Sequence, residues 1–560
     1  VALGYSSLMN QNFTSSTDSF NTAVGFQAGT AVTTGLRNTL IGGLAGDALT
    51  DADDNVALGN LALSSDTLGS RSVAIGKEAL FSQTFTSATN TYNTAVGAFA
   101  GNAVTTGVNN TLIGGQAGDH ITTGASNVAV GYDALGDTTT GGDNTAVGEL
   151  ALSNNTTGIR NVAVGSSALF TKTTGNDNTA IGTGSLYSTT TASFNTGVGQ
   201  NTLELNTTGA NNVAVGVQAL RANTTASNNT AVGKDALLAN TTGYENTAVG
   251  KDSLTANTTG FRNQSFGTAS LLANTTGEDN TSLGQSSMQT NTTGDKNTAV
   301  GNYALKSATT ADNNTAVGYY SLYANTTGAT NTAIGGNALT ANTTGAANTA
   351  VGNGAGDNVT TGSNNSFLGL DTGYNLTTGS ANIYVGYNNT ASAVDVSNEL
   401  LIGSNADGGG TNTVKLQTSG GSATLGLDGS DTSWAAASDS RLKKDVATSA
   451  VGLDFIKDLR PITFKWNAKN AIANNLPQYD ASSSDPVHGS GKTQHGFLAQ
   501  EVKTAIDEHS GLKDGFTMWR EDPDGTQQVA PTALVPMLVK AVQELSTQVD
   551  ELKQELIALK

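Results

Sequence analysis

Few residues in this chain combine a type and a spacing that could do chemistry. The sequence contains no cysteine, which removes disulfides and thiolate metal sites. Ser438 is followed by Asp439 and, five residues after the serine, by Lys443. Taken alone, Ser438 before Asp439 is typical of a helix N-cap, Lys443 of a solvated charge, and His495 of a surface histidine. The remaining histidines lie in no motif: His120, His488 and His509.

The acidic residues do not form the pair of carboxylates that hydrolysis of a glycoside requires. In the central part of the chain they fall mostly beside glycines that recur at fixed positions, as do Glu149, Asp177 and Asp235. Glycine supplies the positive φ of tight turns, so these side chains are expected to face solvent. We therefore expect no enzyme with multiple turnovers, no metal site and no cofactor.

About 400 residues of the chain repeat one unit of 17 residues, which begins with NTAVG or a close variant. The full pentapeptide begins at Asn21, Asn93, Asn144, Asn229, Asn246, Asn297, Asn314 and Asn348. The spacing widens to 21 residues between Ser72 and Asn93, and again before Asn21. A short, fixed period is the signature of a stacked repeat architecture.

Seventeen residues are too few for a pair of helices, which needs about 33, but suffice for one coil of a β-solenoid with two strands and two turns. We expect two apolar anchors per coil, one on each strand: the fourth residue, such as Val24 or Ile41, and the ninth, such as Leu152 or Leu220. The asparagines at positions 1 and 12 are expected to form ladders or to cap turns. The N-T-T triplets match glycosylation sequons, but we interpret them as the turn consensus of the repeat.

These anchors give each coil a thin core, because their inner partner is usually alanine. We infer that one face of the rod is buried between chains, most simply in a homotrimer. The predicted fold is mainly β, with a homotrimeric parallel β-solenoid rod over residues 1–403. Insertions within Gln11–Phe20 and Phe81–Tyr92 lengthen two coils, as recognition loops or as tolerated loop variation.

The composition changes near Trp434, the first of three tryptophans, and all six prolines lie at Pro461 or later. We assign residues 404–437 to a β-rich neck and 438–537 to an α/β domain, with helices at 452–459 and from His495 onward and a strand at 463–466. A heptad seam predicts a coiled coil over 538–560. Its apolar positions are Leu538, Val542, Leu545, Val549, Leu552, Leu556 and Leu559. Valine and leucine there favour two strands, but the three-fold symmetry inferred for the rod outweighs this preference.

The formal net charge is −19, and residues 1–437 carry −16 of it, with 12 Lys and Arg against 28 Asp and Glu. An acidic rod argues against nucleic acid and anionic lipid as partners. No apolar run is long enough to cross a bilayer, so we expect no membrane span. The sequence begins in mid-repeat at Val1, so we expect the anchor of the rod to lie beyond it.

Four segments of the C-terminal region resemble, in order, the intramolecular chaperone domain of endosialidase-type phage tail spikes and fibres, an autoproteolytic serine peptidase. They are SDSRLK at 438–443, LRPITFKW at 459–466, HGFLAQEV at 495–502 and ALVPML at 533–538. The rod resembles, with a longer repeat, the β-roll heads of trimeric autotransporter adhesins, whose VAIG coil recurs at 73–76.

The resemblance implies that this domain trimerises, templates folding of the rod and then cleaves the chain between Ala437 and Ser438. Ser438 would be the nucleophile and Lys443 the general base, with Lys444 as the alternative base and with Asp439 and His495 in support. A serine hydroxyl needs a base, and a lysine amine acts as one only where burial lowers its pKa. Desolvation at a trimer interface would couple cleavage to assembly.

We therefore expect a structural fibre, first of all a phage tail fibre in the virion that binds a glycan or protein receptor on the host. The alternative is an extracellular or cell-surface adhesive fibre of a bacterium, assembled by the same domain. Two other functions fit less well. An enzyme acting on host polysaccharide would need an inserted catalytic domain, and ice binding by stacked threonine columns gains no support from a chaperone domain.

Overall fold

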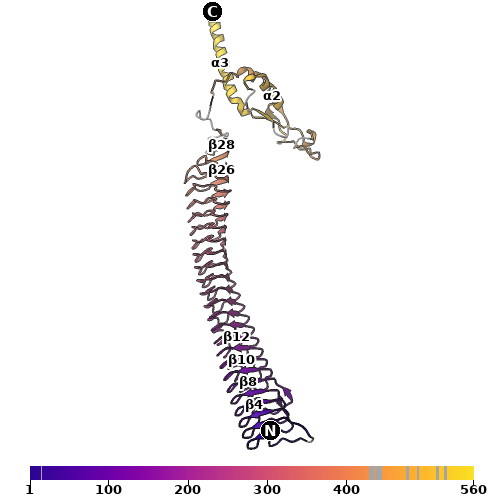
Figure 1. The fold of residues 1–560 in the computed structure, drawn as a ribbon. Coiled ribbons are helices and arrows are strands. Elements are labelled where there is room, and N and C mark those ends of the chain that lie inside the picture. The colour runs from indigo at the N-terminus through magenta and orange to yellow at the C-terminus, as the bar shows by residue number, and fades with distance from the viewer. Residues whose placement is uncertain are drawn as a thin grey trace. The chain divides into compact units, whose positions relative to one another are not determined.

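A computed structural model describes residues 1–13, 16–419, 421–427, 435–436, 444, 446–474, 478–488, 491–512, 516, 518–521 and 526–560. The chain divides into two compact units, Val1–Ala437 and Ser438–Lys560. The first is a stack of coils and the second carries most of the helices (Figure 1). Within the described residues, no helix has the length and apolar character needed to cross a membrane.

The first unit is a β-solenoid of about 24 coils, and each coil contributes one short strand to a single parallel sheet (Figure 1). Successive strands pair in register 17 residues apart, so that Thr145 lies opposite Val162 and Val162 opposite Thr179. The strands are β1 Ala2–Leu3, β2 Thr22–Val24, β3 Thr39–Ile41, β4 Val56–Leu58, β6 Val73–Ile75, β8 Thr94–Val96, β9 Thr111–Ile113, β10 Val128–Val130, β11 Thr145–Val147, β12 Val162–Val164, β13 Thr179–Ile181, β14 Thr196–Val198, β15 Val213–Val215, β16 Thr230–Val232, β17 Thr247–Val249, β18 Gln264–Phe266, β19 Thr281–Leu283, β20 Thr298–Val300, β21 Thr315–Val317, β22 Thr332–Ile334, β23 Thr349–Val351, β24 Ser366–Leu368, β25 Ile383–Tyr387 and β26 Glu399–Ser404. The predicted 17-residue β-solenoid is confirmed.

The repeat is modified in two places. In the longer coil near residues 81–92, β5 (Gly69–Ser70) and β7 (Thr89–Asn90) form a second small parallel pair. At the C-terminal end, β27 (Thr413–Thr418) still runs parallel to β26, but β28 (Gly421–Gly426) pairs antiparallel with β27, and β29 (Ala435–Ala436) antiparallel with β28. The parallel stack therefore ends in a hairpin.

The interior of the rod differs from the predicted one at the fourth position of the repeat. The third residue of each unit points inward, and Ala146 and Ala231 are fully buried. The fourth points outward, leaving Leu58 44% and Ile181 40% exposed. The reason is the two-residue alternation of a strand, which places positions 2 and 4 on the face opposite to position 3. The prediction for position 4 is thus wrong, whereas the leucines at position 9, such as Leu152, are fully buried as predicted.

The second strand predicted for each coil is also wrong, because turns take its place throughout the described coils. Positions 7, 9 and 17 have positive φ, as at Leu150 (58°), Leu152 (53°) and Arg160 (55°). Left-handed residues interrupt an extended backbone. The coils still bond to one another there, since Leu152 N donates to Ala168 O at 2.9 Å.

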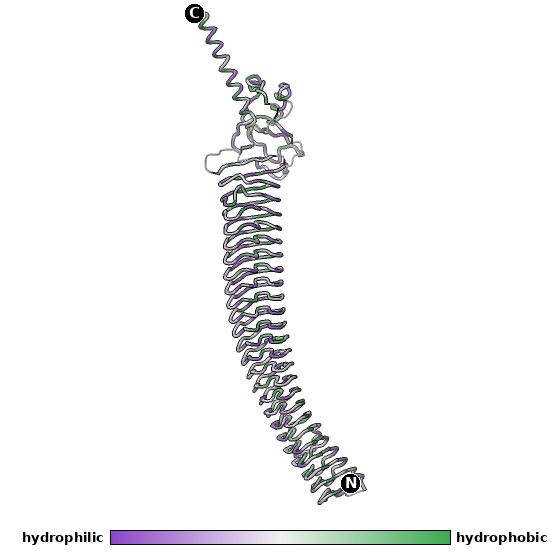
Figure 2. The backbone as a smooth tube through the Cα atoms, turned by 60° about the vertical axis from the view of Figure 1, so that its left-hand side comes forward, coloured by the Kyte–Doolittle hydropathy of each residue, from purple (hydrophilic) through white to green (hydrophobic). Residues whose placement is uncertain are grey.

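Large and small residues compensate for one another in the core, and the hydropathy pattern recurs from coil to coil (Figure 2). Leu40 and Leu112 replace the alanine at position 3, and their own coils have Gly46 and Gly118 at position 9 in place of leucine. A Cβ added to either glycine would come within 2.8 to 2.9 Å of the leucine side chain of its coil. The volume of the core is thereby kept nearly constant, as close packing requires.

The asparagines at position 1 form a buried ladder along the rod. The backbone N–H of Asn229 donates to Asn212 Oδ1 at 3.0 Å, and Asn229 Nδ2 donates to Gly243 O at 2.9 Å. Asn229 Oδ1 in turn accepts from Asn246 N at 3.0 Å. Each side chain thus satisfies backbone groups of two coils that would otherwise be buried without partners. The predicted asparagine ladder is confirmed.

Position 12 carries a second, interrupted ladder. Asn223 Nδ2 donates to Asn206 Oδ1 at 2.8 Å, and Asn240 Nδ2 to Asn223 Oδ1 at 3.0 Å. These asparagines belong to N-T-T triplets and are fully buried. The folded rod therefore does not offer them for glycosylation, which needs an exposed acceptor.

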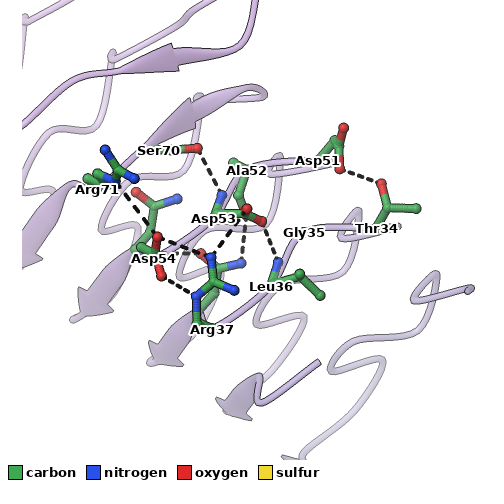
Figure 3. A network of polar contacts seen from close by, with 12 residues as sticks. Thr34, Gly35, Leu36, Arg37, Asp51, Ala52, Asp53, Asp54, Ser70 and Arg71 are labelled. Carbon is green, nitrogen blue, oxygen red and sulfur yellow. Dashed lines mark hydrogen bonds and ion pairs between the residues drawn. The ribbon is translucent and has the colours of Figure 1, made fainter. Parts of the chain in front are cut away.

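Charged side chains at the turns pair across neighbouring coils, and Figure 3 shows one such network. Arg37 Nε donates to Asp54 Oδ1 at 2.5 Å, while Asp53 Oδ1 accepts from Leu36 N at 2.7 Å. The hydrogen bond from Arg37 lowers the pKa of the Asp54 carboxyl. Exposed ion pairs of this kind are screened by salt and contribute little to stability.

One lysine interrupts the column of position 12. Lys172 is fully buried, in the coil between those that place Asn155 and Thr189 at the same position. Its Nζ donates to Ala192 O at 3.0 Å. Burial lowers the pKa of the Lys172 ammonium to about 7, although the nearby charge of Asp177 acts in the opposite direction.

The second unit contains ten short or medium elements among its described residues. They are α1 Leu453–Asp458, β30 Ile462–Phe464, η2 Lys469–Ala471, β31 Gln494–Gly496, α2 Ala499–Glu508, η3 Ser510–Leu512, β32 Trp519–Glu521, β33 Gln527–Val529, η4 Pro531–Leu534 and α3 Val535–Ala558. The expected helix at 452–459 and strand at 463–466 are present with small shifts. The helix expected from His495 begins only at Ala499, because residues 494–496 pair with β30.

We expect Asn229→Ala to destabilise the rod. The change leaves Asn246 N–H and Gly243 C=O without partners, at a cost of about 1 to 3 kcal/mol for each buried group. Thermal unfolding followed by circular dichroism measures the loss. The matched control is Asn211→Ala at the exposed position 17, where Ala347 already adopts a positive φ; an equal loss in both variants would contradict a role for the ladder.

We expect the stability of the rod to depend on pH through Lys172. The unfolded chain keeps this proton up to the ordinary pKa of 10.5, whereas the folded rod releases it near pH 7. Stability should therefore rise as the pH rises from about 7 to 10.5 and be lowest below pH 7. Lys172→Asn, the residue of neighbouring coils, should stabilise the rod at pH 6 by on the order of 4 kcal/mol and hardly at all above pH 10. Denaturant unfolding of both proteins across this range checks the expectation, and a difference that does not change with pH contradicts it.

Candidate functional site

The predicted cleavage site lies at the boundary between the two compact units, which the chain crosses from Ala437 to Ser438. Ala437, Ser438, Asp439 and Lys443 themselves lie outside the described residues. Lys444, the alternative base, is described and exposed. The geometry of the proposed serine–lysine pair therefore stays a prediction.

His495, the supporting residue predicted farther along the chain, lies in the small antiparallel sheet of the C-terminal unit. It is the central residue of β31 and lies opposite Thr463 of β30. Its side chain is exposed. An imidazole in this position is open to solvent and can exchange protons with it, and nothing in its described surroundings shifts it from that state.

The other three histidines have structural neighbours. His509 Nε2 lies 2.7 Å from Asp458 Oδ2, and its ring meets the Phe455 ring edge-on at 5.4 Å. His488 packs edge-on against Trp466 at 4.7 Å. His120 Nδ1 lies 3.4 Å from a carboxylate oxygen of its neighbour in sequence, Asp119. These contacts account for the three residues without a catalytic role.

An apolar core joins the helices and strands of the C-terminal unit. Its buried members are Phe455, Leu459, Val502, Ala505, Ile506, Leu512, Met518 and Leu534. They come from α1, α2, the segment before β32 and the turn before α3. On the surface, Arg460 pairs with Glu501 through both carboxylate oxygens, which ties the end of α1 to the first turn of α2. The unit is thus a packed domain of its own.

The first half of α3 belongs to this domain, through a contact that links residues 91 positions apart. Glu544 Oε2 accepts from Leu453 N at 2.7 Å, so a carboxylate of α3 caps the first turn of α1. This hydrogen bond is the main cause of the lowered pKa of Glu544, and Lys540, 3.3 Å away, adds to it. Ala541 is buried on the same side of α3.

Beyond Glu544, α3 leaves the domain core and exposes an apolar stripe. Leu545, Val549, Leu552 and Leu556 are 42 to 62% exposed, and all four occupy the predicted a and d positions of the heptad. Heptad stripes of this kind pack against the same stripe of a second helix. A 24-residue helix is confirmed here, whereas its partner helices are not part of a single chain.

The stacked rod and the compact C-terminal domain define a fibre-type protein with a separate folding domain at its end. Residues 438–511 match the family model described as the chaperone of endosialidase. The chain therefore carries an endosialidase-type chaperone domain, and this family is one of autoproteolytic chaperones. Neither the curated proteins nor the solved structures gave a significant match.

The match begins at Ser438, the predicted nucleophile, and includes three of the four segments that carried the resemblance. The fourth, at 533–538, lies after it and leads into α3. Sequence reasoning missed the cap that Glu544 forms on α1, since nothing in the local sequence links the two residues. It also placed the outward column of the rod inside the core, although the alternation within each T-A-V strand could have indicated the reverse.

Proposed function

We propose that the protein is a homotrimeric fibre for attachment to a surface, whose C-terminal domain templates assembly and then cleaves itself away. Residues 1–403 form the shaft, 404–437 the neck, 438–537 the chaperone and 538–560 a trimeric coiled coil. The observation that carries the proposal is an apolar stripe on each unit that a single chain leaves uncovered.

The stripe on the rod is the column of fourth positions on the outer face of the sheet. Isoleucine, valine and leucine occupy this column in coil after coil, and Ile113, Leu283 and Leu368 are 39%, 38% and 53% exposed. Uncovered apolar surface of this length is unusual in a monomer and marks an interaction surface. Three rods packed by this face would bury it along their whole length.

The stripe on α3 supports the same assembly from the other end. Residues 545–556 present leucine and valine at heptad spacing with no apolar partner in their own chain. Three such helices would bury the seam and bring three copies of the chain into register. This matters because identical coils allow neighbouring rods to slip by 17 residues, and non-local parallel packing is slow.

Self-cleavage in this proposal is an acyl shift within one peptide bond. Lys443 accepts the proton of Ser438 Oγ, which attacks the carbonyl carbon of Ala437. The bond from that carbon to the Ser438 nitrogen breaks, and the nitrogen takes the proton and becomes a free amine. Water then hydrolyses the resulting ester, which yields the carboxylate of Ala437 and restores the serine. Asp439 and His495 assist, and no cofactor is needed.

Cleavage would make assembly irreversible. Once the templating domain has left, the trimeric shaft has no way to re-form after unfolding, so it persists by kinetic rather than equilibrium stability. The fibre would act in the virion of a phage, bound to a glycan or protein of the host, or alternatively outside or on the surface of a bacterial cell. Its acidic shaft does not suit nucleic acid as a partner.

We expect the expressed chain to split into fragments of residues 1–437 and 438–560, and Ser438→Ala to stay whole. Lys443→Met should also stay whole, whereas Lys444→Met should cleave, which separates the two candidate bases. Intact mass spectrometry identifies the new termini. Uncleaved wild-type protein, or cleavage that persists in Ser438→Ala, would refute the proposed peptidase step.

We expect the shaft to sediment as three copies. Replacing Ile181, Val232 and Leu283 of the outer column by glutamate should yield monomers or aggregates, because three charges per chain would be buried. The matched control places glutamate at position 7, where Glu78 already stands, through Gln116→Glu, Gln218→Glu and Ser286→Glu. Analytical ultracentrifugation measures the mass. A monomeric wild type, or equal behaviour of both triple variants, would rule out packing by this face.

A further inference from the structure

Four tyrosines and one lysine gather on the turns of two neighbouring coils, those that begin at Asn297 and Asn314. The Tyr320 ring lies 4.3 Å from Tyr319, 4.6 Å from Tyr323 and 5.2 Å from Tyr303, measured between ring centroids. Lys306 Nζ lies 5.2 Å from the Tyr303 ring and 5.5 Å from the Tyr323 ring. We call these five residues the tyrosine cluster.

The cluster is a surface feature and not an extension of the core. Its residues occupy positions 6, 7 and 10 of the repeat, and Tyr319 is 56% exposed. Tyr303 and Tyr320 adopt positive φ angles of 61° and 58°, a conformation that bulky residues seldom take. Other coils have small or polar residues at position 7, such as Ser286 before the cluster and Asn337 after it. Exposed aromatic rings held together at such sites point to a binding surface.

The lysine of the cluster differs from the other rod cations that lie over aromatic rings. Arg71, Lys77 and Arg262 also lie over rings, but each is paired with a carboxylate at 3.8, 3.3 and 2.6 Å. Among the described residues, no carboxylate lies within ion-pair distance of Lys306, whose charge is shared only with two tyrosine rings. On an acidic rod, this leaves one local positive charge available to a ligand.

We propose that the tyrosine cluster binds a saccharide that carries a carboxylate. A pyranose ring presents C–H groups on one face, which pack on the flat face of an aromatic ring, and its hydroxyls suit tyrosine hydroxyls and the exposed amides of Asn302 and Asn337 on either side. Lys306 would bind the carboxylate. A single cation in an acidic rod favours one charged group per site over a densely charged polymer such as nucleic acid.

The proposal deepens the attachment function proposed above and rests on it: it places the contact with the target surface on the side of the shaft. The hydroxyls of the cluster are suited to hydrogen bonding at neutral pH, because a hydrogen bond with Tyr319 and burial raise the pKa of Tyr320 further above its ordinary value. The aromatic rings give contact area at little cost in side-chain entropy, since each tyrosine has two rotatable bonds.

The test uses the full-length chain, labelled and applied to an array of bacterial and animal glycans that contains carboxylated members and their neutral or methyl-esterified counterparts. We expect binding to carboxylated members. Titration calorimetry with the best-bound saccharide should give at least a tenfold loss of affinity for Tyr303→Asn with Tyr320→Asn. Lys306→Gln should abolish the preference for the free acid over its methyl ester.

The substitutions copy residues that the repeat already uses, asparagine at position 7 and glutamine at position 10 in Gln289. The control is Tyr132→Asn, because Tyr132 has the position and the 56% exposure of Tyr319 but no aromatic neighbour among the described residues. Binding should not change in this variant. No binding to any glycan, or equal affinity in all variants, would overturn the proposal, as would loss of the oligomer in the tyrosine variant, which would make the cluster a contact between copies.

Cleavage and oligomeric state are measured on the same samples. A wild type that cleaves itself and sediments as a trimer but binds no glycan would refute the saccharide site alone. A wild type that fails to assemble would refute the fibre proposal, whatever the array gives.

Discussion

The ladder of buried asparagines is the interaction on which the rod depends. Each coil buries mainly alanine and one leucine, so apolar packing alone offers little to hold a 17-residue loop of chain in place. One side chain such as Asn229 bonds backbone groups of its own coil and of the next, and it closes the coil by reaching a carbonyl 14 residues ahead. The fixed period of the sequence is the outcome, since an added or missing residue would leave these groups buried and unpaired.

The period, the leucine column and the asparagine ladders could be predicted, because each repeats at one position and its chemistry has one natural place. Two features could not be read in the same way. The valines and isoleucines at position 4 are apolar and regular, and a monomeric rod would bury them; they face outward because Ala146 and its equivalents take the inner face of the strand. The turn that replaces the second strand depends on leucines with positive φ, which composition does not reveal.

Prediction of the site succeeded where the sequence carries a motif. The family match begins at Ser438, as the resemblance implied, but the approach of Lys443 to Ser438 depends on the folded arrangement of residues outside the described part of the chain. Long-range contacts were beyond reach for a physical reason. Glu544 caps α1 across 91 residues, and only the folded domain brings an exposed-looking heptad glutamate to that helix end.

The repeat also has a consequence for how such a protein can change. Every coil between Asn93 and Asn382 offers the same top and bottom surfaces to its neighbours, so whole units can be gained or lost by recombination within the gene while the ladders stay continuous. Length then varies in steps of one strand spacing, about 4.8 Å. The reach of the protein from its point of attachment is thereby an evolvable quantity that is separate from the chemistry of either end.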